Sequence, residues 1–309
     1  MFRKLNTKVL LIALIGLLAV VVCVYLLDRS TGERTFKESL VHTDSETIDK
    51  IKLLPKNGGH KGMEFEKNGN NWTVSQNGTS YPADNSAIMD LINSLNPLKT
   101  ESVVTSNPNH FKDFDMSDST ATRVKLMKGS NVIADLLVGK FDISSGQKMN
   151  TYVRLFNDNV VYSVAGYLSM DANRELDAFR SHKIVEGNKA DWSKLEFNYP
   201  ADSSFILEKQ SEGKWHIGMV DINSADVDKF LDPLQHLTNS KFSTHLPSSK
   251  PIYTLKISGS KLAVPVEVDG YSDTSGNLII STSQNTGNLF EGKDFMDKVF
   301  PGKKLFLKK

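Results

Sequence analysis

The sequence predicts an α+β protein in which an N-terminal transmembrane helix precedes two copies of one unit, each an antiparallel sheet with one helix. Three observations lead to this fold class. An apolar run opens the chain, one pattern of residues recurs later, and turn signals separate the expected strands. The expected segments are a cytoplasmic tail (1–8), a transmembrane anchor (9–27), a linker (28–44), a first α+β repeat (45–187) and a second (188–309).

The anchor is predicted from an apolar run between Val9 and Leu27. Its 19 residues would extend about 28 Å as a helix, close to the hydrocarbon thickness of a bilayer. Arg3, Lys4 and Lys8 precede the run, and positive charge tends to remain on the cytoplasmic side. We therefore expect a single-pass protein of the cytoplasmic (inner) membrane, with a cytoplasmic N-terminus and the bulk of the chain periplasmic or extracytoplasmic.

Two alternatives to an uncleaved anchor remain open. A signal peptide also has a basic start, but its apolar core usually runs about 7–15 residues and ends at a small-x-small site. Tyr25, Leu26 and Leu27 precede Asp28 here, which makes a poor cleavage site. Lipidation of Cys23 is the second alternative, although valines precede it where lipoprotein signals place leucine and small residues.

Composition excludes several classes of site. Cys23 is the only cysteine, so the chain beyond it can form neither an internal disulfide nor a cysteine-ligated zinc site. The formal net charge is +1, and leaving out the three cationic residues before the anchor (1 − 3) gives about −2 for the remainder. This near-neutral balance lacks the positive surface that binds nucleic acid, so no nucleic-acid partner is expected.

The internal duplication is predicted by aligning the sequence around Trp72 with the sequence around Trp215. Further along the chain the two copies match at an offset of 131 residues (256 − 125), with Lys125 opposite Lys256 and Gly139 opposite Gly270. The earlier matches, at an offset of 142 residues (208 − 66), are Glu66-Lys67 with Glu208-Lys209, Ala83-Asp84 with Ala225-Asp226, Asp90 with Asp232, Leu95 with Leu237, and Lys99 with Lys241.

In the first repeat, the turn sequence Asn68-Gly69-Asn70 predicts a hairpin that presents Trp72. Asp84 is expected to cap a helix, and Pro97 to end it. The apolar residues of that helix recur at three- and four-residue spacing and share one face; they are Ile88, Leu91, Ile92 and Leu95. The expected strands are 51–53, 63–66, 72–74, 123–126, 132–138, 151–155 and 160–164.

The second repeat follows the same order, with a helix from about Ala225. The alignment places Pro233 opposite Leu91, so this helix should kink or restart with Asp232 as its cap. Hairpins with one helix in each repeat indicate antiparallel sheets and an α+β fold. The expected strands are 205–208, 215–217, 253–257, 264–268 and 277–281.

Some of these features together resemble a known family. They are the apolar N-terminal run, the hairpin from Glu66-Lys67 to Trp72, Ala83-Asp84 at a helix start, Gly139, Tyr152-Val153-Arg154 and Val161-Tyr162. They resemble a bacterial family known as domain of unknown function 4340, over nearly all of the chain beyond the anchor. In the second repeat Leu278-Ile279-Ile280 stands where Tyr152-Val153-Arg154 would be expected. Members are often encoded beside ABC-transporter components, so the resemblance implies an accessory or assembly role at the cell envelope and no enzymatic activity.

No catalytic, cofactor-binding or metal site is predicted, and the pattern names no binding residue. His236 and His245 are the closest histidine pair in the second repeat, but the chain has no His-Glu-x-x-His spacing. It also lacks the Gly-x-Ser-x-Gly elbow of hydrolases and the phosphate-binding Gly-x-x-x-x-Gly-Lys-Ser/Thr loop. We therefore expect a protein that is not an enzyme and that holds no cofactor.

Two pairs of residues have a functional and a structural interpretation. Trp72 and Trp215 could form a paired recognition surface, because aromatic residues are enriched at binding hot spots. The core of each repeat is the favoured interpretation. Tyr152 and Arg154 alternate on a strand and could mark a polar recognition face, but a solvated strand face is favoured.

The function that we expect is that of a membrane-anchored envelope protein whose duplicated external part is a non-catalytic accessory, assembly or interaction module. Its partners would be subunits of an ABC transporter or another envelope complex. The alternative is an extracytoplasmic ligand-binding module for a glycan, peptide or lipid, with the site between the repeats. A hydrolase is least favoured, because it needs a catalytic group that no motif indicates.

Overall fold

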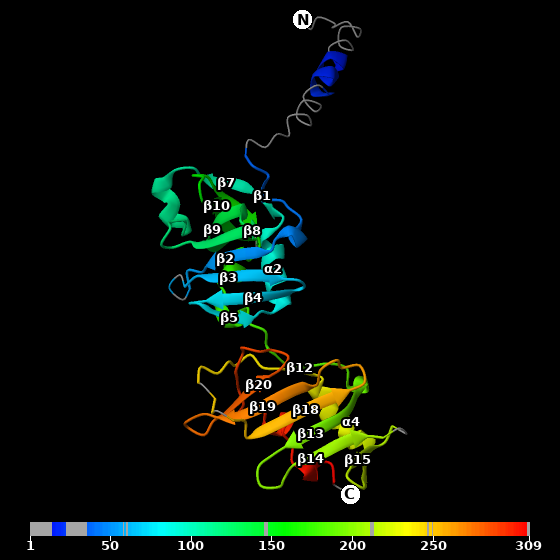
Figure 1. Ribbon diagram of the computed structural model, residues 1–309. Coiled ribbons are helices and arrows are strands. Elements are labelled where there is room, and N and C mark those ends of the chain that lie inside the picture. Colours follow the sequence, from blue (N-terminus) through cyan, green and yellow to red (C-terminus); the bar gives the residue numbers. More distant parts are fainter. Residues whose placement is uncertain are drawn as a thin grey trace, which may run out of the picture.

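The computed structural model describes residues 14–22, 36–57, 59, 61–144, 148–210, 213–245, 247–248 and 250–307. In this part of the chain two units follow one another, each built on one large sheet (Figure 1).

The structure contradicts the predicted N-terminal transmembrane helix. No helix in the described ranges is both long and apolar enough to cross a membrane. Of the expected anchor (9–27), the structure describes residues 14–22, which are helical and exposed. The tail (1–8), the remainder of the anchor, and the alternatives at Cys23 and Asp28 lie outside the described residues.

The first unit contains a nine-stranded antiparallel sheet in the order β5-β4-β3-β2-β8-β9-β10-β11-β7. The predicted turn joins β3 to β4, and Gly69 there has a φ of 61°, a conformation that glycine adopts without strain. The strands are β2 (Lys50–Leu54), β3 (Met63–Asn68), β4 (Asn71–Gln76), β5 (Thr79–Pro82), β7 (Ser102–Thr105), β8 (Thr122–Lys128), β9 (Asn131–Ser144), β10 (Lys148–Leu155) and β11 (Val161–Ala165).

The second unit contains an eight-stranded antiparallel sheet in the order β16-β15-β14-β13-β18-β19-β20-β21. The eight strands correspond in order to the strands from β5 to β11 of the first sheet. The first sheet has one further strand, β7, at its edge beside β11. The strands are β13 (Trp192–Asn198), β14 (Phe205–Lys209), β15 (Trp215–Ile217), β16 (Val220–Ile222), β18 (Tyr253–Gly259), β19 (Val266–Ser272), β20 (Leu278–Thr282) and β21 (Phe290–Glu291).

Each unit also has a small two-stranded pairing at its start. β1 (Ser39–Val41) pairs with β6 (Leu98–Lys99), and β12 (Lys183–Glu186) pairs with β17 (His236–Thr238). A short 3-10 helix follows the first strand of each pair, η1 (Ser45–Thr47) or η4 (Lys189–Asp191). β1 and β12 precede residues 45 and 188, where the sequence pattern placed the starts of the repeats.

The long helices correspond in the two units, but not in the register that the alignment predicts. Helix α2 (Asn85–Leu95) and helix α4 (Ser224–Leu234) bury matching residues that lie 139 positions apart (227 − 88). The offset of 142 is therefore wrong by three residues here, because β15, β16 and their connection to α4 are shorter than the first-unit counterparts. The buried residues are Ile88, Leu91, Ile92 and Leu95 in α2, and Val227, Phe230, Leu231 and Leu234 in α4.

Helix α4 does not restart at Asp232, so the restart alternative of that prediction is wrong. The Asn223 side chain caps the helix by accepting the Ala225 N–H, and the helix runs through Pro233 to its last residue, Leu234. Pro233 lies in the final turn, and the carboxylate of Asp232 pairs instead with the Lys189 ammonium at 2.5 Å.

The cap of α2 is confirmed and allows a measurement of its contribution to stability. The Asp84 carboxylate accepts the N–H groups of Ser86 at 2.9 Å and Ala87 at 3.3 Å. We expect Asp84→Ala to lower the free energy of unfolding by about 1 kcal/mol in urea denaturation, because both N–H groups lose their acceptor. Asp90→Ala, at an exposed position of the same helix, should change it by less than about 0.5 kcal/mol. Equal losses in the two variants would contradict a capping role.

The closing segment of each unit repeats as well, although the sequence alignment does not extend to it. Helix α3 (Leu168–Ala172) and η3 (Leu176–Ala178) precede Phe179, and α5 (Met296–Val299) and η5 (Lys303–Leu305) precede Phe306. Both phenylalanines are buried, Phe179 edge-on to Phe65 at 5.0 Å and Phe306 edge-on to Phe230 at 5.5 Å.

The predicted α+β class is wrong, because the structure is mostly β. Strands contain 41% of the described residues and helices contain 22%. Helices α2 and α4 have 11 residues each, whereas α3 and α5 have five and four. The sequence pattern also missed several short strands, because β5, β7, β12, β16 and β17 are too short or too polar to show an alternating pattern.

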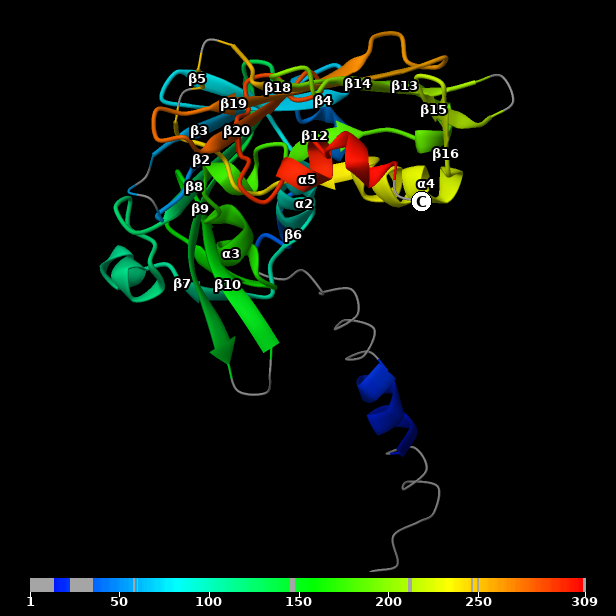
Figure 2. The same ribbon diagram turned by 90° about the horizontal axis from the view of Figure 1, so that it is seen from below.

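The sheets of the two units present their open faces on the same side of the molecule. Figures 1 and 2 show α2 and α4 on the same side of their sheets, and neither of these helices covers the other face. Paired charges occupy this outer face, including Lys52 with Glu64 at 2.6 Å in the first unit and Lys194 with Glu196 at 2.5 Å in the second. Opposite charges on neighbouring strand positions stabilise a sheet, so the face is charged but locally neutral.

One part of the outer face of the first sheet is covered. The connection between β7 and β8, which includes η2 (Pro108–Phe114), packs a small core of Met116, Ala121, Leu137 and Val161 there. The backbone passes so close to Gly139 that a Cβ atom on this glycine would lie 2.1 Å from the Phe114 carbonyl oxygen. The structure thus explains Gly139 by close packing of this connection on β9.

Candidate functional site

The joint between the units is formed by the segment that leaves the first unit. Phe179 and Ser181 hydrogen-bond to the backbone at the end of β5: the Asp84 N–H donates to the Phe179 oxygen at 2.8 Å and the Ser181 N–H to the Pro82 oxygen at 2.9 Å. Ala83 and Arg180 form an antiparallel bridge between these contacts. The backbone therefore stays attached to the first unit up to Ser181, two residues before β12.

Arg180 lies at the centre of this joint and is only 7% exposed. Its guanidinium carbon lies 4.1 Å from the ring centre of Tyr81 in the first unit and 3.8 Å from that of Phe242 in the second. Its Nε donates to Asn288 Oδ1 at 2.7 Å, and its Nη1 donates to Asp177 Oδ1 at 3.0 Å. One buried cation thus contacts aromatic and polar groups of both units.

Two buried asparagines of the second unit complete the joint. Asn285 Nδ2 donates to the oxygens of Ser181 at 2.7 Å and Lys183 at 2.8 Å. Asn288 Nδ2 donates to Asn285 Oδ1 at 2.6 Å and to the Pro82 oxygen at 3.3 Å. Each asparagine is 1% exposed, so these bonds form away from water and hold the connecting segment against both units.

A cleft of about 680 Å³ lies beside the joint and is lined by both units. Its walls carry mostly amide, hydroxyl and backbone groups, and the rings of Trp72 and His182 also line it. The first unit contributes residues from 71 to 86, and the second contributes Lys183, Glu186, Thr238, Gln284 and Thr286. A polar lining of this kind suits a ligand with many hydrogen-bonding groups.

The charges in this cleft are engaged with the protein itself. The Lys183 ammonium pairs with the Glu186 carboxylate and, by this hydrogen bond, lowers the pKa of Glu186. Gln284 holds the backbone of Glu186 from both sides, accepting its N–H at 2.7 Å and donating to its oxygen at 2.8 Å. The Asp84 carboxylate is taken up by the cap of α2. The cleft therefore offers recognition by hydrogen bonds rather than a poised acid and base.

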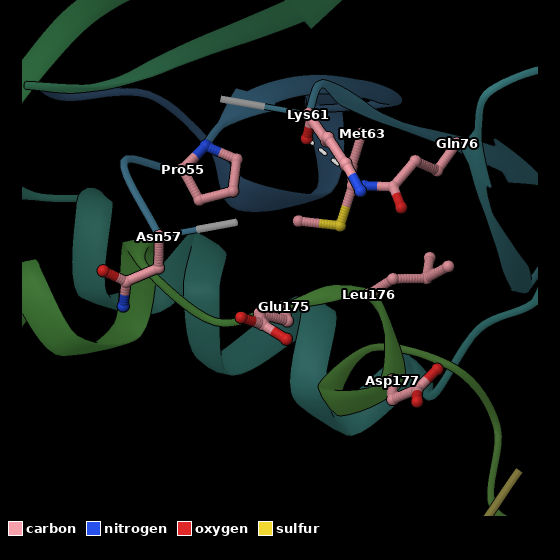
Figure 3. Close-up of a pocket in the computed structure, with 8 residues that line it drawn as sticks. All are labelled: Pro55, Asn57, Lys61, Met63, Gln76, Glu175, Leu176 and Asp177. Carbon is pink, nitrogen blue, oxygen red and sulfur yellow. Dashed lines mark hydrogen bonds between the residues drawn. The ribbon is translucent and has the colours of Figure 1, made fainter. Parts of the chain in front are cut away.

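A second cavity, of about 430 Å³, opens at one end of the first sheet. Pro55, Met63 and Leu176 give it an apolar floor, and Figure 3 shows the Met63 thioether and the Leu176 side chain on either side of the hollow. Polar residues surround the opening: Asn57, Lys61, Gln76, Glu175 and Asp177. An apolar floor beneath a polar rim is the usual composition of a small binding pocket.

The structural interpretation of the two tryptophans is confirmed. Trp72 is 3% exposed and belongs to the core of the first unit, and Trp215 is 4% exposed in the core of the second. They do not form a shared exposed surface.

The expected solvated strand face is wrong for Arg154, which is 7% exposed. Its guanidinium donates to the carbonyls of Phe156 at 3.1 Å, Asp158 at 3.0 Å and Met116 at 3.3 Å, and burial lowers its pKa. Arg154 thus holds the β7–β8 connection to the turn after β10. Tyr152 is half-buried, and its hydroxyl donates to Asp142 at 3.0 Å.

The histidine pair of the second unit lies at the surface, with both His236 and His245 exposed. Among the described residues, no group of three or more histidine, cysteine, aspartate or glutamate side chains is placed to hold a metal ion.

The sequence pattern missed the residues of the joint, and only weak signals pointed to them. Arg180 lies in a stretch without helical or strand periodicity, and Asn285 and Asn288 look like ordinary turn residues. Their importance comes from contacts across more than a hundred residues, such as the 108 residues that separate Arg180 from Asn288.

Fold and site together define a class of duplicated β-rich proteins in which a buried polar joint connects two units. The chain belongs to the family described as Domain of unknown function (DUF4340), whose sequence model matches residues 72–256. The match runs from β4 of the first unit to β18 of the second and includes Arg180, so it spans the connection between the units. No curated protein and no solved structure matches the chain.

Proposed function

We propose that this chain is a non-catalytic interaction module in which two units, held in one orientation, present a joint surface to a partner protein. The observation that carries this proposal is the Arg180 joint. The Arg180 guanidinium lies over the rings of Tyr81 and Phe242, and two buried asparagines surround it. A flexible tether would not need so many buried contacts between the units. A constant orientation is useful when one partner contacts both units at once, because less freedom is lost on binding.

The arrangement of the sheets supports this proposal. The open faces of both sheets lie on the same side (Figure 2), so a partner could contact both without passing around the molecule. Ion pairs such as Lys50 with Glu66 at 2.6 Å neutralise charge within the face. Recognition would then depend on shape and hydrogen bonds more than on long-range attraction.

Subunits of an ABC transporter or another envelope complex are the partners that we propose, because of the resemblance noted from the sequence. An inner-membrane or extracytoplasmic location belongs to the same proposal and is to be measured by fractionation.

Crosslinking in cells, followed by affinity capture and mass spectrometry, tests the proposal. We expect transporter or envelope subunits to be recovered with the natural chain and with Arg174→Ala, but severalfold less with Arg180→Ala. Arg174 is the matched control, because it pairs with Asp171 three residues earlier just as Arg180 pairs with Asp177. Recovery of background proteins alone, at normal expression of the natural chain, would contradict the proposal.

A second candidate function is binding of a polar ligand in the cleft, and the shared lining of about 680 Å³ favours it. The hydrogen-bonding walls favour a glycan or an extended peptide over a lipid. Thermal unfolding in the presence of oligosaccharides and short peptides tests this function, because a ligand of the native state raises the midpoint. A midpoint rise that Gln284→Ala abolishes would support it, and an unchanged midpoint with every compound would contradict it.

A further inference from the structure

The duplication allows the cavity of the first unit to be compared with the same place in the second. Leu53 opposite Met63 is the last residue pair of the β2–β3 ladder, and Phe197 opposite Phe205 is the last pair of the β13–β14 ladder. Two residues beyond Leu53 lies Pro55, which therefore corresponds to Tyr199. Two residues of the cavity floor, Met63 and Pro55, thus occupy the positions of Phe205 and Tyr199.

In the second unit these positions are filled with packed rings. Phe197 stacks on Phe205 with a centroid distance of 4.4 Å and an interplanar angle of 15°. Tyr199 meets Phe205 edge-on at 6.0 Å, and its hydroxyl donates to the Pro301 oxygen at 3.0 Å. Burial raises the pKa of the Tyr199 phenol, so the neutral hydroxyl remains a donor there.

In the first unit smaller side chains leave the hollow of about 430 Å³. Met63 stands in place of Phe205, and Pro55 in place of Tyr199. A methionine thioether makes favourable contacts with aromatic rings and adapts its shape to them. Met63 is only 1% exposed, so Leu176 offers more of the surface for a ring. The same framework has built a ring into the corresponding place of the second unit.

The rim of the cavity offers hydrogen-bond acceptors. Gln76 Nε2 donates to the Lys61 backbone oxygen at 3.2 Å, and Asn57 Nδ2 donates to the Asn173 oxygen at 3.3 Å. One N–H of each amide is thus engaged with the protein, and Figure 3 shows the amide oxygen of Gln76 pointing toward the hollow. Glu175 adds an exposed carboxylate, and Lys61 contributes the one ammonium among the described residues that line the cavity. This rim, with carboxylate and amide oxygens beside amide N–H groups, suits a ligand whose polar end is a hydroxyl, which can both donate and accept.

We propose that this cavity binds a tyrosine side chain presented by a partner protein, with the ring against Leu176 and close to the Met63 methyl group, and the hydroxyl at the rim. The proposal deepens the interaction function and rests on it, because the partner supplies the tyrosine. Aromatic anchors in apolar pockets contribute a large share of the binding free energy of many interfaces. The cavity would act as the anchoring point of the first unit.

The test uses the full chain with its methionine methyl groups labelled with carbon-13 and N-acetyl-L-tyrosinamide as the probe. We expect a saturable upfield shift of the Met63 methyl resonance, because a ring placed above it adds a ring-current field. The Met219 methyl group is fully exposed and should not move. N-acetyl-L-leucinamide should give no upfield shift. A Met63 resonance that does not respond, or that responds equally to both compounds, would overturn the proposal.

A variant that fills the cavity provides the second arm. Pro55→Tyr copies the second unit and should shift the Met63 methyl resonance upfield in the absence of the probe. It should also weaken the affinity for the probe by at least about tenfold. Pro200→Tyr, at an exposed proline of the second unit, is the matched control and should bind as the natural chain does. If Pro55→Tyr does not fold, Leu176→Phe fills the same space from the opposite wall. Probe binding that survives whichever filled variant folds would contradict the assignment.

The two proposals can fail separately. Binding of the probe without recovery of any partner would support the tyrosine site and contradict the interaction function. Recovery of a partner without any response of the Met63 resonance would support the interaction function and contradict the tyrosine site.

Discussion

We expect Arg180→Ala to lower the free energy of unfolding by about 3 kcal/mol and to release the two units from their common orientation. The substitution removes the bonds to Asn288 and Asp177 and the cation between the rings of Tyr81 and Phe242. It also leaves the Asn288 oxygen buried without this donor. A large effect is expected because a buried group of one unit can no longer satisfy a buried group of the other.

Scanning calorimetry and small-angle X-ray scattering measure this prediction together. The natural chain should unfold in one transition, whereas the variant should show two transitions and a larger radius of gyration. Arg174→Ala serves as the control, since its ion pair with Asp171 stays within the first unit and is half-exposed. A variant at position 180 with the scattering curve of the natural chain would rule out an orienting role.

The second large effect is expected for Gly139→Ala, which should lower the free energy of unfolding by about 3 kcal/mol. The added methyl group would meet the Phe114 oxygen at 2.1 Å and the Met116 methyl at 2.6 Å. Backbone cannot yield as a flexible side chain can, so the β7–β8 connection would have to lift away from β9. Urea unfolding measures the loss, and tryptophan fluorescence follows the two cores.

Gly302→Ala provides the control for a glycine with space around it. Its φ is −70°, and no atom lies within 4 Å of the added methyl group. We expect a change below about 0.5 kcal/mol, because the residue needs neither a left-handed conformation nor a close approach. If position 139 tolerated alanine equally well, the close packing seen there would not contribute to stability.

Much of the local structure could be predicted from the sequence, because short-range patterns determine it. The turn at Gly69 and the cap at Asp84 each depend on neighbouring backbone groups, and both occur as expected. The burial of Trp72 and Trp215 followed from their repeated position in a hairpin. Such features need no knowledge of distant residues.

Three predictions failed because longer-range packing decided the outcome. The alignment of the two helices was wrong by three residues. It paired Asp90 with Asp232, but the side chains that α4 buries determine which positions of α2 and α4 correspond. The α+β class underestimated the strands, because edge strands such as β7 are formed by pairing with a neighbour and not by their own pattern. Arg154 is buried because the β7–β8 connection folds over it, which its position on a strand could not show.

The residues of the candidate sites could not be predicted, although the sequence analysis gave a site between the repeats as an alternative. The cleft is formed by residues from both units, and the cavity depends on the small size of Met63 compared with its counterpart Phe205. A difference of this kind is visible in the sequence only when the ladder register of both hairpins is known.

The joint also has a consequence for the order in which the protein is completed on the ribosome. The first unit has all of its core residues once Phe179 has been made, and domains near the N-terminus generally fold first during synthesis. Asn288, which binds Arg180, emerges 108 residues later. The nascent chain therefore carries a finished first half whose direction relative to the second is undecided until the final strands are translated. Quality control that acts on the last part of the chain would thus monitor the geometry of the whole molecule.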